Sequence, residues 1–123
     1  MAKEESNISK RIMLKLSESC RIFRNNVGLF TTNTGAKVKT GLCKGSSDLI
    51  GWHTVEITPD MIGKKIGIFL AVEVKSAKGR ASEQQLNFID KVKEAGGIAF
   101  IARSDSEAQN KLNARIKEFQ DAR

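Results

Sequence analysis

The sequence FLAVEVKS, at residues 69–76, decides the fold of this chain. Its apolar residues are enough to cross a sheet, and they end in an acid and a base two positions apart, Glu73 and Lys75. Because successive strand side chains point to opposite faces, these two share one face, and Val72 and Val74 share the other. Metal-assisted phosphodiester cleavage needs a carboxylate for a hard cation and a lysine near the phosphate. A strand that simply leaves the core and turns polar explains the same residues.

The residues around this stretch predict a strand, a helix and a second strand. The first strand is expected over residues 66–76 and is followed by the basic loop SAKGRAS. Ser82 begins a helix that runs to about Ala95, where two consecutive glycines stop it. The apolar stretch 98–103 is a second strand. Such a unit is typical of a right-handed parallel crossover.

The rest of the chain predicts further helices and short strands in a single domain, residues 1–123. Ser6 or Ser9 can cap a first helix that runs to about Glu18. The other elements follow in order: a strand at 21–24, a long loop or flexible hairpin at 25–41, a strand pair or broken strand at 48–57, a helical turn after Thr58, and a charged helix at about 106–122. The expected class is therefore α/β.

Composition narrows the classes of function. The chain has 123 residues, a net charge of +7 and a pI of about 9.7, which favours an anionic partner, with nucleic acid the commonest. A basic surface kept for solubility is the alternative. Two cysteines and one histidine exclude a zinc site of the usual ligand count, and no P-loop motif occurs. No secretory leader or membrane span is evident, so an intracellular, cytoplasmic location without a membrane partner is expected.

Two further residues are candidates for chemistry. Asp48 lies in GSSDLIG, between small residues and an apolar strand, where its carboxylate can be exposed; an Asx-turn at the strand entrance is the alternative. Gln85 stands three residues after Ser82, where a capping box places Glu or Gln. It also lies on the helix stripe that faces the sheet, from which its amide could position a water or a carbonyl. Both interpretations of Gln85 remain open.

The segment GSSDLIG followed by FLAVEVKSAKGRASEQQLNFIDKVKEAGGIAFIARS resembles the virus-type replication-repair nuclease (VRR-NUC) domain. That family belongs to the PD-(D/E)xK nuclease superfamily, and the resemblance covers about residues 21–103. It implies a restriction-endonuclease-like fold, in which helices flank a central mixed β-sheet. Ser47 stands where the superfamily motif has proline, and this small turn residue keeps the placement of Asp48 plausible.

The resemblance also implies roles for particular residues. The matching active-site residues are Asp48, Glu73, Lys75 and Gln85, and the family's first-helix glutamate matches Glu18. Asp48, Glu73 and the backbone carbonyl of Val74 would then hold Mg²⁺ or Mn²⁺. From periodicity alone, Glu18 is as readily an exposed helical residue. The cations expected to contact flanking phosphates are Lys37, Lys39, Lys44, Lys78 and Arg80.

Small stand-alone members of the family are similar to phage proteins that act as homodimers on branched DNA, including Holliday junctions. The expected function is therefore a metal-dependent DNA endonuclease, in the host cytoplasm if the chain is phage-encoded. Two alternatives remain open: a non-enzymatic nucleic-acid-binding module, and a nuclease that cuts ordinary duplex or flap DNA. Carboxylates within a basic surface argue against a pure phosphate binder, because they repel the ligand.

Overall fold

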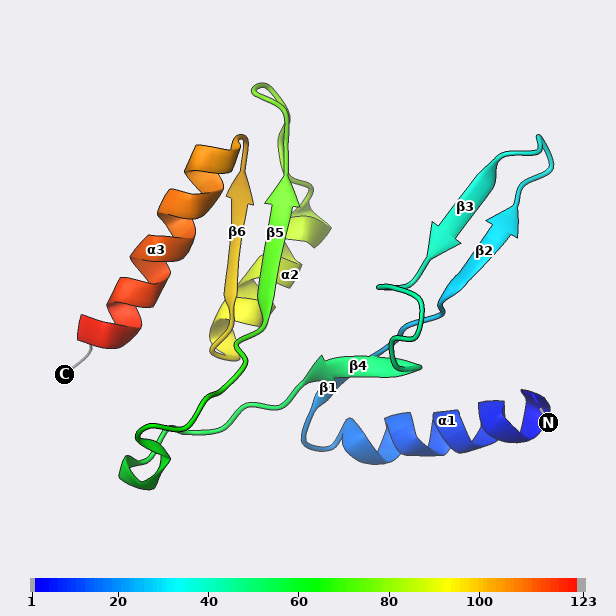
Figure 1. Ribbon diagram of the computed structural model, residues 1–123, viewed down its shortest axis with the longest axis horizontal. Coiled ribbons are helices and arrows are strands. Elements are labelled where there is room, and N and C mark those ends of the chain that lie inside the picture. The colour runs from blue at the N-terminus through cyan, green and yellow to red at the C-terminus, as the bar shows by residue number, and fades with distance from the viewer. Residues whose placement is uncertain (1, 122–123) are drawn as a thin grey trace. The chain divides into compact units, whose positions relative to one another are not determined.

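The computed structural model describes residues 2–121, and the chain divides into two compact units. The first unit ends at Val55 and the second begins at Glu56. The structure has the mixed α/β class that the sequence predicts, with three α-helices and three two-stranded sheets among the described residues (Figure 1). The strands of the described residues form three separate sheets, so the single central mixed sheet stays a prediction.

The first unit contains one helix and two antiparallel strand pairs. Its elements are α1 (Ala2–Leu16), β1 (Arg21–Arg24), β2 (Gly28–Thr31), β3 (Lys37–Thr40) and β4 (Leu49–Trp52). β1 pairs with β4, and β2 pairs with β3 to form a hairpin. The hairpin is one of the two structures expected for residues 25–41. In residues 48–57, where a strand pair or broken strand was expected, the structure has the single strand β4.

Close approach of two backbones explains the glycine in β4. A Cβ atom at Gly51 would lie 1.8 Å from the carbonyl oxygen of Arg21 on β1, a distance that no side chain tolerates. On the same strand pair, the rings of Phe23 and Trp52 pack with their centroids 5.5 Å apart. The β1–β4 pair is therefore held by a tight backbone contact together with an aromatic contact.

Helix α1 differs from its predicted bounds at both ends. It begins at Ala2 and ends at Leu16, so neither Ser6 nor Ser9 is its cap, and Glu18 lies in the turn that follows it. Glu4 and Glu5 place negative charge in its first turn, where the partial positive charge of the helix N-terminus favours it. Leucine and lysine are good helix formers, and they carry the helix through Leu16.

The second unit is built on the predicted crossover. Its elements are η1 (Pro59–Met61), β5 (Leu70–Val74), α2 (Glu83–Glu94), β6 (Ile98–Ala102) and α3 (Asp105–Asp121). β5 and β6 are parallel, with Leu70 opposite Ile98 and Val74 opposite Ala102, which confirms the strand–helix–strand prediction. β5 is shorter than expected at both ends, since residues 66–69 and 75–76 are not in a strand.

The small core of this unit lies where β6 meets α2, and α3 also contacts β6. Its buried apolar residues are Ile89, Val92, Ile98, Ala99 and Ala102. Gly96 ends the helical segment with φ of +96°, and a Cβ at Gly97 would lie 2.7 Å from a methyl group of Val92. The two glycines thus turn the chain and let it approach the helix closely, as the predicted helix stop requires.

Burial along β5 alternates with the strand period. Ala71 and Glu73 are half-buried on the face towards α2, whereas Leu70, Val72 and Val74 are exposed on the other. The alternation confirms that Glu73 lies on the opposite face from the two valines. Within residues 2–121, no helix combines the length and the apolar character that crossing a bilayer requires.

Candidate active site

The carboxyl end of β5 carries an acid–base pair. Nζ of Lys75 lies 3.4 Å from Oε2 of Glu73, and their side chains are 20% and 29% exposed. The amide of Lys75 donates a hydrogen bond of 3.1 Å to the carbonyl of Ala102, so the backbone stays paired just beyond β5. The ammonium and the carboxylate therefore project side by side from a paired backbone, partly shielded from water but still reachable.

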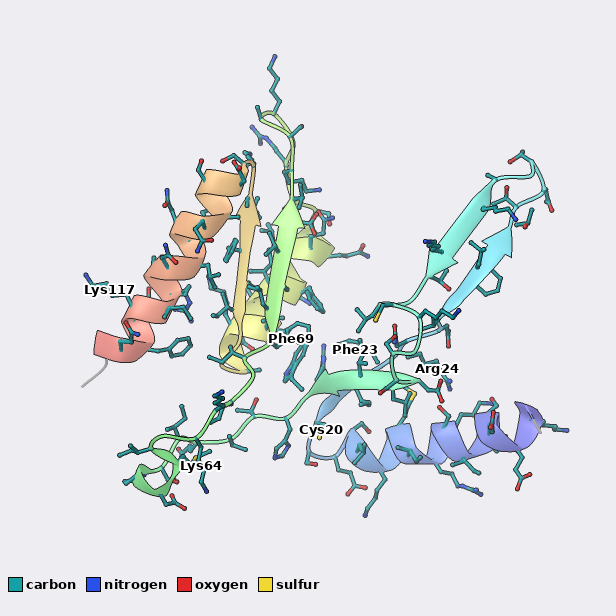
Figure 2. All side chains as sticks on the ribbon, viewed as in Figure 1. Cys20, Phe23, Arg24, Lys64, Phe69 and Lys117 are labelled. Atoms are coloured by element: carbon teal, nitrogen blue, oxygen red, sulfur yellow. The ribbon has the colours of Figure 1, made fainter. Side chains whose placement is uncertain are left out.

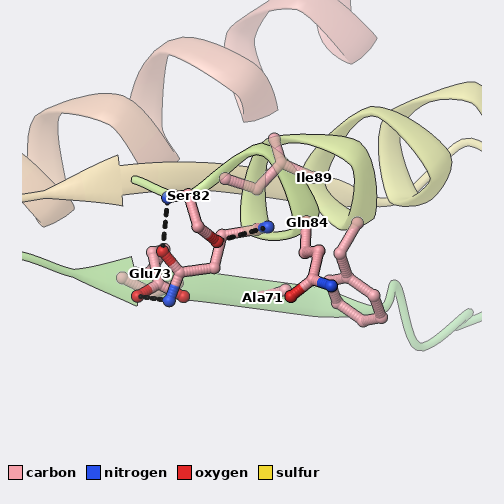
Figure 3. A pocket seen from close by; sticks show the side chains of 8 residues that line it. Ala71, Glu73, Ser82, Gln84 and Ile89 are labelled. Carbon is pink, nitrogen blue, oxygen red and sulfur yellow. Dashed lines mark hydrogen bonds between the residues drawn. The ribbon is translucent and has the colours of Figure 1, made fainter. Parts of the chain in front are cut away.

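Gln85, in the first turn of α2, touches both its own helix start and Glu73. Ser82 and Gln85 form the predicted capping box. The backbone N–H of Gln85 donates to Oγ of Ser82 at 3.1 Å, and the backbone N–H of Ser82 donates to Oε1 of Gln85 at 2.9 Å. The nitrogen of the same side-chain amide, Nε2, donates to Oε2 of Glu73 at 2.9 Å (Figure 3). Gln85 therefore caps the helix and also faces the sheet, but its amino group contacts a carboxylate rather than the water or carbonyl considered from the sequence.

The capping box determines which way the Gln85 amide faces. Oε1 must accept from the N–H of Ser82, so the amino group is left to point at Glu73. Oε2 of Glu73 then accepts the hydrogen bond from the Gln85 amide and also forms the ion pair with the Lys75 ammonium. Among the described residues Oε1 of Glu73 has no hydrogen-bond partner. That oxygen is the one available to a cation or to water.

A cavity of about 470 Å³ opens beside this cluster (Figure 3). Its polar end is formed by Glu73, Ser82 and Gln85, and its other lining residues are Ala71, Val72, Gln84, Phe88 and Ile89. A concave space with a few convergent polar groups at one end is the usual form of a binding site. The second unit thus supplies an acid and an amide at the edge of a cavity, with the Lys75 amine next to the acid.

The loop after β5 carries two of the predicted phosphate contacts, Lys78 and Arg80, and both are exposed. A turn in which the Gly79 N–H donates to the Ser76 carbonyl shapes this loop. The guanidinium of Arg103, just after β6, donates to the Gly79 carbonyl at 2.8 Å. Arg103 therefore ties the basic loop to the neighbouring strand.

Asp48 lies in the first unit, immediately before β4. Its carbonyl accepts a hydrogen bond of 2.8 Å from the N–H of Asn25. Among residues 2–121 its carboxylate makes no hydrogen bond, so the Asx-turn considered from the sequence is not formed. The side chain is exposed and available to a ligand.

Asn25 holds the segment that leads to Asp48, and the sequence analysis missed it. It is only 5% exposed. Its amino group donates to Oγ of Ser46 at 2.7 Å and to the carbonyl of Ser47 at 2.8 Å, while its Oδ1 accepts from the N–H of Leu42 at 2.8 Å. The signal in the sequence is weak: an asparagine just after a strand, next to a second asparagine.

The other predicted residues of the first unit are exposed. Glu18 pairs with Lys15 at 3.7 Å, with side chains 66% and 79% exposed, so its local contacts assign it no further role. Lys37 and Lys39 lie on β3, and Lys44 lies in the turn that precedes Asp48. The structure leaves all three lysines accessible to an anion.

The donor atoms suit a hard cation. In neither unit, over residues 2–121, do three His, Cys, Asp or Glu side chains gather in one place. Glu73 offers one uncommitted carboxylate oxygen, and Asp48 offers a carboxylate without a hydrogen bond. Oxygen donors of this kind are those that Mg²⁺ and Mn²⁺ accept.

The second unit thus combines an acid and a base at a strand end, an amide on the next helix that contacts the acid, and a parallel crossover. The family model for the VRR-NUC domain matches residues 10–106, most of the chain. The chain therefore belongs to the VRR-NUC family, the virus-type replication-repair nucleases, and DNA is the substrate that membership implies. No curated protein and no solved structure matches it significantly.

Proposed function

We propose that this chain is a divalent-metal-dependent DNA endonuclease. One observation carries the proposal: in a member of a nuclease family, Glu73 lies 3.4 Å from the Lys75 ammonium and 2.9 Å from the Gln85 amide, beside a cavity. A strand that merely turned polar would have no need of a helix amide directed at its carboxylate. The fold proposed for the whole chain is the restriction-endonuclease-like one, with a central mixed sheet.

Asp48, Glu73 and the backbone carbonyl of Val74 are the proposed ligands of Mg²⁺ or Mn²⁺. The ion supplies a more acidic bound water and neutralises charge that develops on the phosphate. Gln85 holds one oxygen of Glu73 in place, which leaves the other directed to the ligand side. Glu18 is proposed to contribute only through water, since its side chain is largely exposed.

Lys75 is the proposed partner of the reacting groups. In phosphodiester hydrolysis, water gives up a proton and attacks phosphorus, one P–O bond forms, the opposite P–O bond breaks, and the leaving oxygen takes up a proton. The Lys75 ammonium either orients the attacking water or stabilises the added charge on the phosphate oxygens. Its distance of 3.4 Å from Glu73 supports a role for both side chains at one phosphate.

The basic residues outside this cluster are proposed to hold the DNA backbone. The set is Lys37, Lys39, Lys44, Lys78 and Arg80, all exposed. Such contacts position a duplex without reading its bases. We propose a homodimer that acts on branched DNA such as Holliday junctions, since two symmetric cuts require two sites at a fixed spacing.

Replacement of Glu73 or Lys75 by alanine tests the chemistry. Either variant should abolish metal-dependent cleavage of supercoiled plasmid and junction DNA, because each removes a group that acts on the phosphate or its ion. Binding of the same DNA in EDTA should remain within a few-fold of the wild type. Glu83→Ala is a matched control, since Glu83 is an exposed acid in the first turn of α2 and stands outside the cluster.

The outcomes separate the alternatives. Unchanged cleavage by Glu73→Ala or Lys75→Ala contradicts the assignment of these residues. DNA binding by the wild type without cleavage under Mg²⁺ or Mn²⁺ favours the non-enzymatic binding module. A panel of linear, flap and four-way junction DNA, with molecular mass measured by light scattering, tests the preference for branched DNA and the dimer.

A further inference from the structure

The β2–β3 hairpin lies in a stretch of the chain whose charged residues are all basic. Between Glu18 and Asp48 the sequence contains five basic residues and neither Asp nor Glu. This stretch alone therefore supplies five of the seven net positive charges of the chain. A segment free of acids is suited to close contact with a polyanion, because no carboxylate in it repels the ligand.

Strand register gives the hairpin two different faces. Leu29 is opposite Lys39 and Thr31 is opposite Lys37, so both lysines lie on one face. Phe30 is opposite Val38, and this pair lies on the other face. The structure thus combines a basic face with an apolar face on one two-stranded element.

Phe30 is presented to solvent rather than packed into a core. It is 57% exposed and Val38 is 41% exposed. A Cβ atom at Gly28 would lie 2.9 Å from two ring carbons of Phe30, so the ring lies over this glycine. The missing side chain at Gly28 gives the ring room to lie along the strand with its outer side open.

The hairpin is closed at its tip and fixed at its base. At the tip, the Thr32 N–H donates to the Ala36 carbonyl at 2.7 Å, and Gly35 adopts φ of +86°. At the base, Oγ1 of Thr40 donates to the Asn26 carbonyl at 2.6 Å. The ring is therefore carried on an ordered element, which lowers the conformational entropy lost on binding.

We propose that Phe30 stacks on a base that is uncovered at a DNA branch point, while Lys37 and Lys39 on the reverse face contact phosphates of the adjoining arm. Aromatic side chains stack on any base, because every base has a π-face. In a continuous duplex those faces are covered by neighbouring base pairs, whereas a branch point interrupts the stack. The inference rests on the proposed DNA substrate and would give the nuclease a preference for branched DNA.

The test measures binding without cleavage, in Glu73→Gln protein with EDTA. Fluorescence anisotropy with a four-way junction and with a linear duplex of the same sequence should show that Phe30→Ala weakens junction binding about 5- to 150-fold. Duplex binding should change little, and Phe30→Trp should retain junction binding. Leu29→Ala is the matched control, since Leu29 is also 57% exposed but lies on the opposite face.

A second readout reports stacking directly. 2-Aminopurine at the branch point should lose fluorescence on binding of the Phe30 protein and not of Phe30→Ala, since stacking on the ring quenches it. Equal junction binding by Phe30→Ala, or an equal loss with both DNAs, would overturn the inference. So would a changed mass or a lowered melting temperature for Phe30→Ala, which would make Phe30 a protein contact. Because no outcome requires cleavage, failure here is distinguishable from failure of the nuclease proposal.

Discussion

At the scale of single residues, Gln85 is the most informative side chain. Its oxygen caps α2 and its amino group reaches Glu73, so one amide joins a helix start to a strand end. A capping box can accept glutamate or glutamine, but only glutamine also provides a donor for a carboxylate. Residue 85 must therefore be glutamine to contact both Glu73 and the start of the helix.

Substitutions of Gln85 should separate these two contributions. Gln85→Glu keeps the cap but places a carboxylate against Glu73, so cleavage should fall at least 10-fold with little loss of helix stability. Gln85→Ala removes both contacts and should also lower the free energy of unfolding by about 1 kcal/mol. Initial cleavage rates and urea denaturation measure the two effects.

The neighbouring Gln84 provides the control for these variants. It is exposed and lines the same cavity, but in the described part of the chain it has no hydrogen bond to Glu73. Gln84→Glu should therefore reduce the cleavage rate less than Gln85→Glu does. Equal rates for Gln85→Glu and the wild type would show that the Glu73 contact has no part in catalysis.

At the scale of elements, Asn25 connects the end of β1 with the segment before β4. Three hydrogen bonds of its side chain and one of its backbone hold residues 42–48, which lead to Asp48. A buried side-chain amide with all its groups satisfied fixes a loop more firmly than an exposed one, because water does not compete for its partners. The position of Asp48 thus depends on Asn25, which is not one of the predicted site residues.

Asn25→Ala should lower the free energy of unfolding by about 3 kcal/mol, because it leaves buried donors and acceptors unpaired. Cleavage should fall with it, since the Asp48 segment loosens. Urea denaturation and cleavage below the melting transition measure both effects. Asn26→Ala is the control, because Asn26 is exposed and the hydrogen bond found at this residue uses only its carbonyl. Equal stability of the two variants would contradict the role given to Asn25.

The start of α3 predicts a pH dependence. A hydrogen bond from the Arg103 backbone N–H, together with the nearby Lys111 ammonium, lowers the pKa of Glu107 below its usual range. A carboxyl with a lowered pKa stabilises the fold above its unfolded pKa, and this stabilisation is lost as pH falls through the folded pKa. The stabilisation that Glu107 gives to the fold is therefore lost at acidic pH.

Glu107→Gln should melt at a lower temperature than the wild type near pH 7, and the difference should shrink as pH falls to about 3. Thermal unfolding followed by circular dichroism across this range measures it. Glu56→Gln, at an exposed position outside the helices and strands, controls for the removal of one negative charge from a basic protein. A difference that stays constant with pH would contradict the assignment.

At the scale of the whole molecule, the excess of positive charge should govern affinity for DNA. Counterion release makes the logarithm of the binding constant fall linearly with the logarithm of salt concentration, by about 0.9 for each phosphate contacted. Replacement of both Lys78 and Arg80 by glutamine should therefore reduce that slope by about 2. Binding titrations over a range of salt concentration, in EDTA, measure the slope.

Lys117, exposed on α3 and outside the predicted set, is the control for this measurement (Figure 2). Lys117→Gln should leave the slope nearly unchanged, although it removes the same charge as either loop substitution. If Lys117→Gln lowers the slope as much per charge as the loop substitutions do, the basic loop has no particular contact with DNA.

Local patterns predicted much of each unit. The crossover, the helix cap at Ser82 and the turn at Gly96 depend on neighbouring residues, and the structure confirms them. The start of α1 was predicted wrongly, because Ser6 and Ser9 are caps only by residue type and the helix continues through them. That Asp48 and Glu73 share an ion stays a prediction, as does a single domain over residues 1–123.

The sequence by itself determined the family, the order of the elements and the face of β5 on which Glu73 lies. The family follows from the match of residues 10–106 to the family model. The order of the elements and the face of Glu73 follow from side-chain period, caps and glycines, which act over a few residues. Only the tertiary structure decided that the Gln85 amide meets Glu73 and that Asn25 holds the Asp48 segment. Those contacts join residues 12 to 22 positions apart, and such pairs meet only through the way strands and helices pack.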